Sequence, residues 1–330
     1  MKRPDPFVEI DRIACGAGLV PEDMERRARA LQDAARQLVS SGSLASAVAK
    51  LLVDRRGRHV ALLTGFVLPD AFPCGENDGP LGTVALARAL HRASFGVSIY
   101  ADPAAVDGVT WLAAEIGAPT PVMPIPEDPL GLTASADIAI AIEKPGENAV
   151  GYMHTWDGRR IERGSVSIDP LFRALAAADK PTIAVGDRGN EIGFGAIHEE
   201  VVSLVPEARR CTCGCGGGIA AVTPADILFP AAVSNWGAYA LCAALAVSLQ
   251  DRSLLLDPGE EERLLHVAAV RGCRDGLLRS AAFGVDGISG AVSSRIVRAL
   301  RTVVDVARAA DEYKAPVRGP IERRSKALHG

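Results

Sequence analysis

The chain has 330 residues, a charged fraction of 23% and a formal net charge of −4, which are ordinary values for a globular protein with a sizeable core. The negative charge, and the lack of a basic stripe interleaved with aromatic residues, argue against a nucleic-acid partner. Seven cysteines, an odd number in a long chain, favour free thiols in a reducing cytoplasm.

The N-terminal part of the chain predicts helices. Residues 1–6 lead into no apolar segment, so we expect no secretory signal. Residues 21–52 show helical apolar periodicity with a polar break at 40–43, which predicts two helices. No Pro- or Ser-rich linker divides the chain, so we interpret it as a single α/β domain. Its parts are a helical N-terminal segment at 1–56, a core at 57–250, C-terminal helices at 251–313 and a frayed tail at 314–330.

Short apolar runs alternate with helical patterns through the core, an order that predicts a parallel sheet with covering helices. The predicted strands are 59–64, 97–100, 121–124, 137–142 and 181–185. The predicted helices are 80–94, 104–116, 170–178, 235–250, 259–273 and 290–312. The expected fold class is therefore α/β, with a mostly parallel Rossmann-like sheet, helices on both faces and extra helices at both ends of the chain.

The stretch 227–249 is apolar enough to raise the question of a membrane span. Pro230 and the polar segment 234–237 interrupt it, and the remaining pieces are shorter than the roughly 20 residues that a span requires. We therefore expect a buried helix that begins at Ser234 or Asn235, and no membrane partner.

Three acidic, glycine-containing segments attract attention because of where they lie. Segment 186–195 follows the strand at 181–185, segment 143–146 follows another predicted strand, and segment 76–80 ends a long loop. Ligands of open α/β sheets bind beyond the carboxyl ends of the strands. Carboxylates at such a place are costly to desolvate without a partner. A divalent cation, with Mg²⁺ or Mn²⁺ as first choices, or a cationic substrate is the expected partner.

Each acidic segment also has a simpler interpretation. Asp78 can be a helix cap, and Glu143 with Lys144 can be a surface ion pair of little energetic value. The loop 186–195 can be a turn with solvated acids. Its glycine spacing differs from the dinucleotide-binding fingerprint, and the chain contains no Walker phosphate loop.

The cysteines at 211, 213 and 215 form a local cluster. Zinc sites usually combine such a unit with a second cysteine pair or with histidines, and no second pair accompanies this one. A three-thiolate zinc or iron–sulfur site, a redox pair and plain free thiols all stay open, and free thiols are the simplest interpretation. His154 lies in an irregular polar stretch at 147–168 and is a candidate base or an ordinary loop histidine.

Five segments occur in an order that resembles the D-glutamate cyclase family, in particular its C-terminal mitochondrial module and its stand-alone bacterial relatives. The matching segments, which span roughly residues 60–250, are 62–66, 76–80, 143–146, 186–193 and 233–241. The chain departs from the family pattern at Asn77, Leu81 and Arg188, where the family usually has Thr, Pro and Gly. Arg188 adds a cation to the expected site.

The resemblance implies a hydro-lyase that dehydrates D-glutamate to 5-oxo-D-proline within one molecule, or hydrolyses the lactam in reverse. On this hypothesis a divalent cation polarises the reacting carboxyl group, and its ligands are Asp78, Glu143, Asp187 and Glu191. The residues expected to act in catalysis are Lys144, Asp187, Asn190 and Glu191. Those expected to contact the small-molecule substrate are Thr64, Gly65, Asp78, Gly79, Arg188, Ser234 and Asn235.

Three other function classes stay open at this point. One is a metal-dependent hydrolase or lactamase that acts on another small carboxylic acid. The second is a small-molecule binding module without catalysis. The third is a thiol-metal protein organised by Cys211, Cys213 and Cys215. The formation of a homo-oligomer is also left open.

Overall fold

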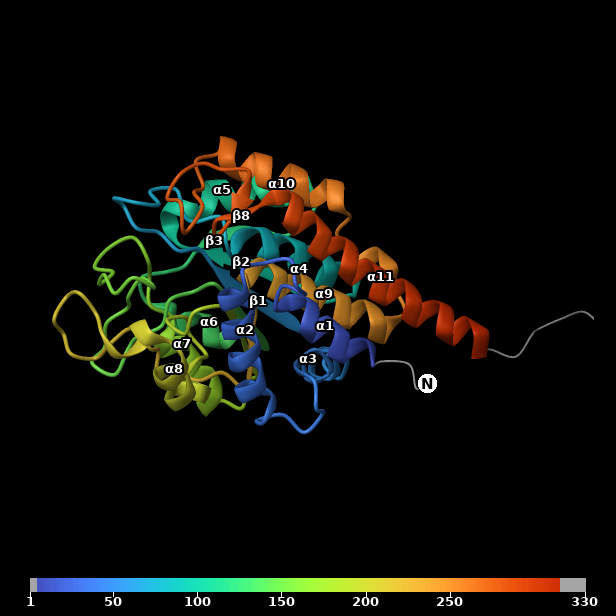
Figure 1. The fold of residues 1–330 in the computed structure, drawn as a ribbon, viewed down its shortest axis with the longest axis horizontal. Helices are drawn as coiled ribbons and strands as arrows, with labels where there is room; N and C mark the ends of the chain where they lie inside the picture. Colours follow the sequence, from blue (N-terminus) through green and yellow to red (C-terminus); the bar gives the residue numbers. More distant parts are fainter. Residues whose placement is uncertain (1–4, 315–330) are drawn as a thin grey trace, which may run out of the picture.

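The computed structural model describes residues 5–314, so the expected tail beyond 314 lies outside the described part. Its centre is a six-stranded sheet with the order β3-β2-β1-β4-β5-β6 (Figure 1). All neighbouring strands of this sheet are parallel. The strands are β1 (His59–Thr64), β2 (Gly96–Ala101), β3 (Val122–Pro124), β4 (Ile138–Ile142), β5 (Thr182–Gly186) and β6 (Ile227–Pro230). This order confirms the expected α/β, Rossmann-like fold.

The central strands are apolar because helices cover both faces of the sheet. All five residues of β4 are buried, and so are Val60–Thr64 of β1. Parallel strands that are covered on both sides read as continuous runs of Val, Ile, Leu and Ala, without alternation. This is why the strand pattern was visible in the sequence.

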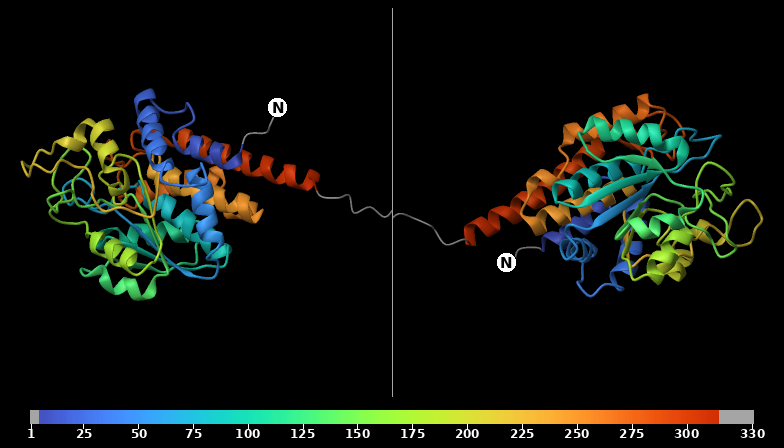
Figure 2. Two further views of the ribbon diagram at one scale, coloured as in Figure 1. Left: turned by 90° about the horizontal axis from the view of Figure 1, so that it is seen from below. Right: turned by 180° about the vertical axis from the view of Figure 1, so that it is seen from behind.

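The helices form layers on the two faces of the sheet (Figures 1 and 2). One face carries α4 (Pro80–Arg92), α5 (Val106–Glu115) and α9 (Ser234–Leu249), and the other carries α6 (Leu132–Ser135) and α7 (Asp169–Ala177). Outer helices pack on α9 and α5: α1 (Pro6–Ala14), α3 (Leu44–Val53), α10 (Pro258–Val270) and α11 (Gly290–Lys314). At the β6 side lie α2 (Glu22–Arg36) and α8 (His198–Leu204).

Helix α9 begins at Ser234, as expected, and is buried from 234 to 247. A helix that is apolar on all sides requires neighbours on all sides. Here α4 packs against it, and α1, α3 and α11 surround it further. Among the described residues, no helix combines the length and the apolar character that crossing a bilayer would demand.

The strand order places a topological switch between β1 and β4. The chain moves outward through β2 and β3 on one side, then returns to β4 and moves outward through β5 and β6 on the other. The loops that follow β1 and β4 part at this point, which is where open α/β sheets bind their ligands. A small hairpin of β7 (Gly284–Val285) and β8 (Ile288–Ser289) joins this edge, because Asn77 Nδ2 donates to the carbonyl of Gly284 at 2.7 Å.

Candidate metal and substrate site

The N-termini of α9 and α4 cap each other: a side chain from the loop before α4 caps α9, and a side chain from the first turn of α9 caps α4. The amides of Ser234 and Asn235, at the start of α9, donate to the Asp78 carboxylate at 2.9 and 2.8 Å. In return Asn235 Oδ1 accepts the amide of Gly82 in the first turn of α4, at 2.7 Å. These amides have no acceptor within their own helix. The first amides of α9 therefore bind the Asp78 carboxylate, and these bonds fix the loop after β1 against the start of α9.

Gly79 allows this loop to approach β4 closely. Its φ is +92°, and a Cβ atom there would lie 2.8 Å from Glu143 Cβ and 2.9 Å from Thr64 Oγ1. Glu143 itself has a φ of +50°, a left-handed conformation that side chains rarely adopt. The Ser234 hydroxyl donates to Glu143 Oε2, so this strained residue directs its carboxylate toward α9. Strain of this kind is characteristic of functional sites.

The loop after β5 is organised by Glu191. Its carboxylate accepts the amide of Gly189 at 2.7 Å and the amide of Arg188 at 3.1 Å, with a longer bond from Asp187 at 3.3 Å. The loop is also tied to the segment after β4, because Ile192 N donates to the carbonyl of Lys144 at 2.8 Å. Glu191 therefore stabilises the turn of the backbone at 187–189, and this turn keeps Asp187 at the carboxyl edge of the sheet.

Asp187 and Asn190 each present a buried oxygen that accepts no hydrogen bond within the described chain, Asp187 Oδ2 and Asn190 Oδ1. The closest cationic group to the Asp187 oxygen is Arg188 Nε, at 3.5 Å. Buried polar atoms are normally paired, so these two oxygens point to a ligand. Asn190 is fixed through its other side, because Nδ2 donates to the carbonyl of His154 at 3.0 Å.

Asp187 belongs to two groups of carboxylates, each with oxygens within 4.8 Å of one another. The first group adds Asp78 and Asp286, and the second adds Glu143 and Glu191. Acidic residues from the loops after β1, β4 and β5 thus meet at one point. Carboxylate oxygens at such spacing suit a hard divalent cation, and one oxygen of Asp187 has no hydrogen-bond partner.

Two residues of this region, Asp286 and Arg27, were not expected from the sequence, and a third, Glu76, was considered beside Asp78 but not included among the expected ligands. Asp286 lies in the turn between β7 and β8 with a φ of +51°, and Glu76 is buried beside it. Arg27, on α2, contributes a positive charge that acts on Asp187. Asp286-Gly287 is a typical hairpin dipeptide, so the turn was open to prediction, although its location was not.

Ionisation of the clustered carboxyl groups is unfavourable, because they are buried and lie close to one another. Burial raises the pKa of Asp78, Asp187 and Asp286 to about 8, and nearby carboxylates add to the effect. Burial and the same neighbours raise the pKa of Glu76 and Glu143 well above the usual range. Groups of like charge in a desolvated place disfavour ionisation unless a cation joins them.

A cavity of about 350 Å³ opens beside the cluster. Asp286 and Arg188 belong to its wall, together with Arg27 and Trp156. The Arg188 guanidinium lies 4.9 Å from the centre of the Trp156 ring. The cavity therefore places two arginines, which suit substrate carboxylates, beside Asp286, the member of the acidic cluster that belongs to its wall.

Lys144 lies outside this group. Its ammonium is fully buried, donates to both carboxylate oxygens of Asp102 at 2.6 Å and to the carbonyl of Gly65 at 3.2 Å. The Thr64 hydroxyl is likewise occupied, by the carbonyl of Ile142 at 3.1 Å. The bonds of these three expected site residues, Thr64, Gly65 and Lys144, therefore join the ends of β1 and β4.

Comparison with known proteins finds relatives of this chain. A family model described as D-glutamate cyclase-like, C-terminal, matches residues 18–301. The human protein named mitochondrial D-glutamate cyclase is 33% identical over 214 residues, which cover 58% of this chain. The match covers 33% of that protein, so the chain spans about a third of the length of this relative.

Among solved structures, RecJ from Thermus thermophilus, in complex with Mn²⁺, covers 82% of this chain and 38% of its own. Its sequence identity is 11% and its TM-score is 0.33. A likeness at this level supports no conclusion about fold or function.

Proposed function

The chain belongs to the D-glutamate cyclase-like family, and from that premise we propose that it is a hydro-lyase. Its reaction is the interconversion of D-glutamate and 5-oxo-D-proline, assisted by a divalent cation. The observation that carries this proposal is Asp187, which belongs to both groups of carboxylates, keeps a buried oxygen without a hydrogen-bond partner and is followed by Arg188, a residue of the cavity wall.

We assign the cation to Asp78, Asp187 and Asp286. Asp187 retains a buried oxygen without a hydrogen-bond partner, and the three loops that carry these residues come together only in the folded chain. Asp78 and Glu191 both accept backbone amides. Glu191 bonds the amides of its own loop, so we assign it to shaping that loop, whereas Asp78 stands in the group that Asp187 shares with Asp286. A bound Mg²⁺ or Mn²⁺ supplies Lewis acidity, which polarises the substrate γ-carboxyl group.

The cavity wall recognises the substrate. Arg188 offers a planar guanidinium to a carboxylate of D-glutamate, and Arg27, on α2, offers a second positive charge. Trp156 packs near Arg188 and limits the directions in which it can turn. Two arginines suit a substrate with two carboxylates. When both carboxylates are bound, the D-glutamate molecule bends into a ring-like conformer that brings its α-nitrogen close to its γ-carbon.

In the cyclisation, a bond forms between the α-nitrogen and the γ-carbon, and one oxygen of the γ-carboxyl group leaves as water. The ammonium group loses two protons and the leaving oxygen gains two, so the reaction consumes no acid or base. We assign the movement of these protons to Glu143, whose carboxylate the Ser234 hydroxyl orients at the cluster. Lys144, paired with Asp102, is assigned to positioning the backbone that carries Glu143.

The test is direct observation of both compounds by proton NMR. The purified chain is incubated separately with D-glutamate and with 5-oxo-D-proline, in the presence of Mg²⁺ or Mn²⁺ or of EDTA. The proposal expects the signals of the other compound to grow in at least one sample, and to stop growing with EDTA or in the Asp187→Asn variant. The L-enantiomers serve as substrate controls.

The alternatives have distinct outcomes in the same experiment. Absence of conversion, together with a rise in Tm on adding either compound, would favour a binding module. Conversion by Asp187→Asn at the rate of the unaltered chain would contradict the assignment of the cation site.

A further inference from the structure

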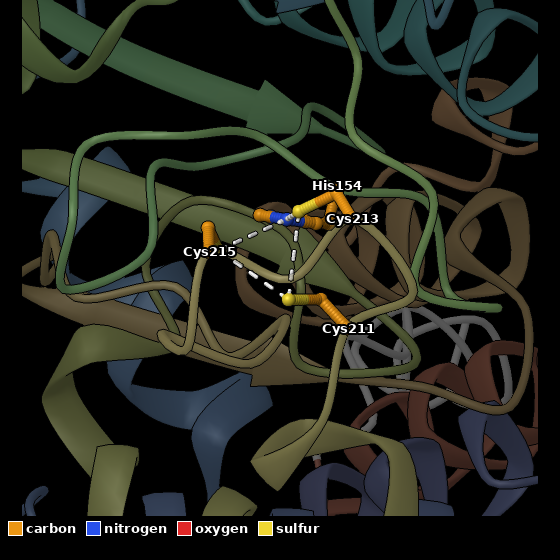
Figure 3. A group of neighbouring side chains, drawn as sticks. All are labelled: His154, Cys211, Cys213 and Cys215. Atoms are coloured by element: carbon orange, nitrogen blue, oxygen red, sulfur yellow. Dashed lines mark hydrogen bonds between the residues drawn. The ribbon is translucent and has the colours of Figure 1, made fainter.

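A second group of metal-ligand side chains lies apart from the acidic cluster. It consists of His154 and the thiols of Cys211, Cys213 and Cys215, whose ligand atoms all lie within 4.8 Å of one another (Figure 3). His154 comes from the irregular segment after β4, and the cysteines come from the loop between α8 and β6. The fourth side chain of the group, which the sequence pattern did not locate, is thus His154, which lies 57 positions before Cys211 and 61 before Cys215.

Four of the six distances between these atoms are close to the edges of a small tetrahedron, and all six are within 4.8 Å. His154 Nε2 lies 3.3 Å from Cys213 Sγ and 3.7 Å from Cys215 Sγ. Cys211 Sγ lies 3.3 Å from Cys215 Sγ and 3.5 Å from Cys213 Sγ. A tetrahedral zinc ion with sulfur ligands at about 2.3 Å requires edges of about 3.8 Å. Small adjustments of the side chains would therefore place one ion within bonding distance of all four.

The histidine is already oriented as metal-bound histidines are. Its Nδ1 lies 3.1 Å from the carbonyl of Tyr152, so the proton belongs on Nδ1 and the lone pair of Nε2 faces the sulfurs. Zinc-binding histidines commonly donate their second ring nitrogen to a backbone carbonyl. The imidazole of His154 is fully buried, which excludes an ordinary solvated loop histidine.

The cysteine loop is built to bring three thiols together within five residues. Gly214, between Cys213 and Cys215, and Gly216, directly after Cys215, have φ values of +77° and +80°, conformations that glycine adopts without strain, so the chain turns at both positions. The loop is held in place at both ends: Thr212 N donates to the carbonyl of Gly158 at 2.8 Å, and Asn148 Nδ2 donates to that of Gly218 at 2.7 Å.

We propose that His154, Cys211, Cys213 and Cys215 bind a single zinc ion in a closed, structural Cys₃His site. Soft thiolates with one imidazole in tetrahedral array select zinc over magnesium or manganese. The four atoms surround the volume of one ion, which disfavours a multinuclear iron–sulfur cluster. No open position remains for a substrate, so the role of the ion is to cross-link two segments.

The cross-link bears on the acidic cluster. The carbonyl of His154 accepts the bond from Asn190 Nδ2, and Ala221 N, just after the cysteine loop, donates to the carbonyl of Gly189 at 3.0 Å. Both contacts support the loop that carries Asp187. The zinc site does not depend on the proposed reaction, because it rests on a separate set of ligands.

The test measures metal content and spectrum in the full chain, purified under reducing conditions without chelators. Elemental analysis is expected to find about one zinc per chain, and Cys213→Ser is expected to lose most of it. Cys74→Ser, a half-buried thiol outside the group, is the matched control and should retain zinc. Asp187→Asn should also retain zinc, which separates this site from the acidic cluster.

Cobalt substitution covers the case in which Cys213→Ser does not fold. Co²⁺ added to the metal-free unaltered chain is expected to give the visible bands of tetrahedral cobalt and thiolate-to-cobalt charge transfer, and His154→Gln should weaken both. The proposal is overturned if the unaltered chain takes up neither zinc nor tetrahedral cobalt. It is also overturned if mass spectrometry of anaerobically purified protein finds two of the three cysteines joined in a disulfide.

Discussion

Several residues at the sheet edge are both buried and polar. Asp187 is the clearest case, because one of its carboxylate oxygens has no hydrogen-bond partner. Its pKa is raised to about 8 because the side chain is desolvated. An unfolded aspartate titrates near a pH of about 3.9. Between about pH 4 and pH 8 the folded chain therefore binds more protons at this position than the unfolded chain, and its stability decreases as the pH rises through this window.

We expect Asp187→Asn to flatten this dependence. In cation-free buffer, the Tm of the unaltered chain should fall more steeply between about pH 5 and pH 9 than the Tm of the variant, and the variant should be more stable at about pH 9, by roughly 2–5 °C. Differential scanning calorimetry at several pH values measures it. Asp70→Asn, at an exposed position, is the control and should follow the unaltered chain. Equal slopes of Tm against pH for all three proteins would show that the pKa of Asp187 is not raised.

Gly79 provides a second prediction at this scale, because conformation and space both restrict it. Gly79→Ala is expected to cost at least about 3 kcal/mol, from the left-handed backbone and from the 2.8 Å approach to Glu143. Gly57→Ala has a similar φ of +88° but meets no atom within 4 Å, so it should cost only about 1 kcal/mol. Urea denaturation measures both. Equal losses would show that the close approach is unimportant.

At the scale of elements, the reciprocal capping of α4 and α9 holds the site together. Asn235 accepts from Gly82 and donates to the carbonyl of Asn77 at 3.0 Å, so one side chain fixes both the helix start and the loop that leads to Asp78. Because the contacts are buried, removing them leaves polar atoms without partners.

Asn235→Ala is therefore expected to lower stability by about 1–3 kcal/mol and also to reduce the cation-dependent conversion. Asp257→Ala removes the exposed cap of α10, whose Oδ1 accepts from Glu260 N at 2.8 Å. It should cost about 1 kcal/mol and leave the conversion unchanged. The prediction fails if the two variants affect activity alike when compared at equal stability.

The elements that could be predicted from sequence are those with local signals. The five expected strands are present. Four of them, β1, β2, β4 and β5, are largely buried and therefore have continuous apolar runs, whereas β3 is a partly exposed edge strand. Helix α9 begins at Ser234, one of the two expected starts. Strand β6 was missed, since its four residues merge with the apolar sequence of α9. Helix α1 falls within the expected helical segment 1–56, but its bounds were not predicted because it is short.

The site was partly predictable for a similar reason. Acids at strand ends, such as Asp187 and Glu143, were recognised because the edge of a parallel sheet collects them. Asp286 and Arg27 come from elements outside the sheet, and only tertiary packing brings them there. The same holds for His154, whose distance from the cysteines in sequence concealed the group of metal-ligating side chain types that they form in the fold. The pairing of Lys144 with Asp102, from the loop after β2, was equally invisible.

For the whole molecule, the sheet, the caps and the cysteine loop converge on one acidic edge, and a cation there should stabilise the entire fold. Ligand carboxylates must be deprotonated to bind metal, so the stabilisation grows with pH. We expect Mn²⁺ at about 100 times its Kd to add about 2.7 kcal/mol to the free energy of unfolding. The gain should be larger at about pH 8 than at about pH 6, and thermal denaturation with and without Mn²⁺ measures it. A gain that is equal at both pH values would argue for cation binding elsewhere.

The central claim is that Asp187 stands at the centre of a hard-cation site, and the most direct test is anomalous X-ray diffraction from crystals grown with Mn²⁺. The account predicts an anomalous peak about 2.0–2.6 Å from an Asp187 carboxylate oxygen, with Asp78 and Asp286 also in contact. A well-ordered acidic cluster without such a peak, in crystals that show Mn²⁺ bound at other positions, would contradict it.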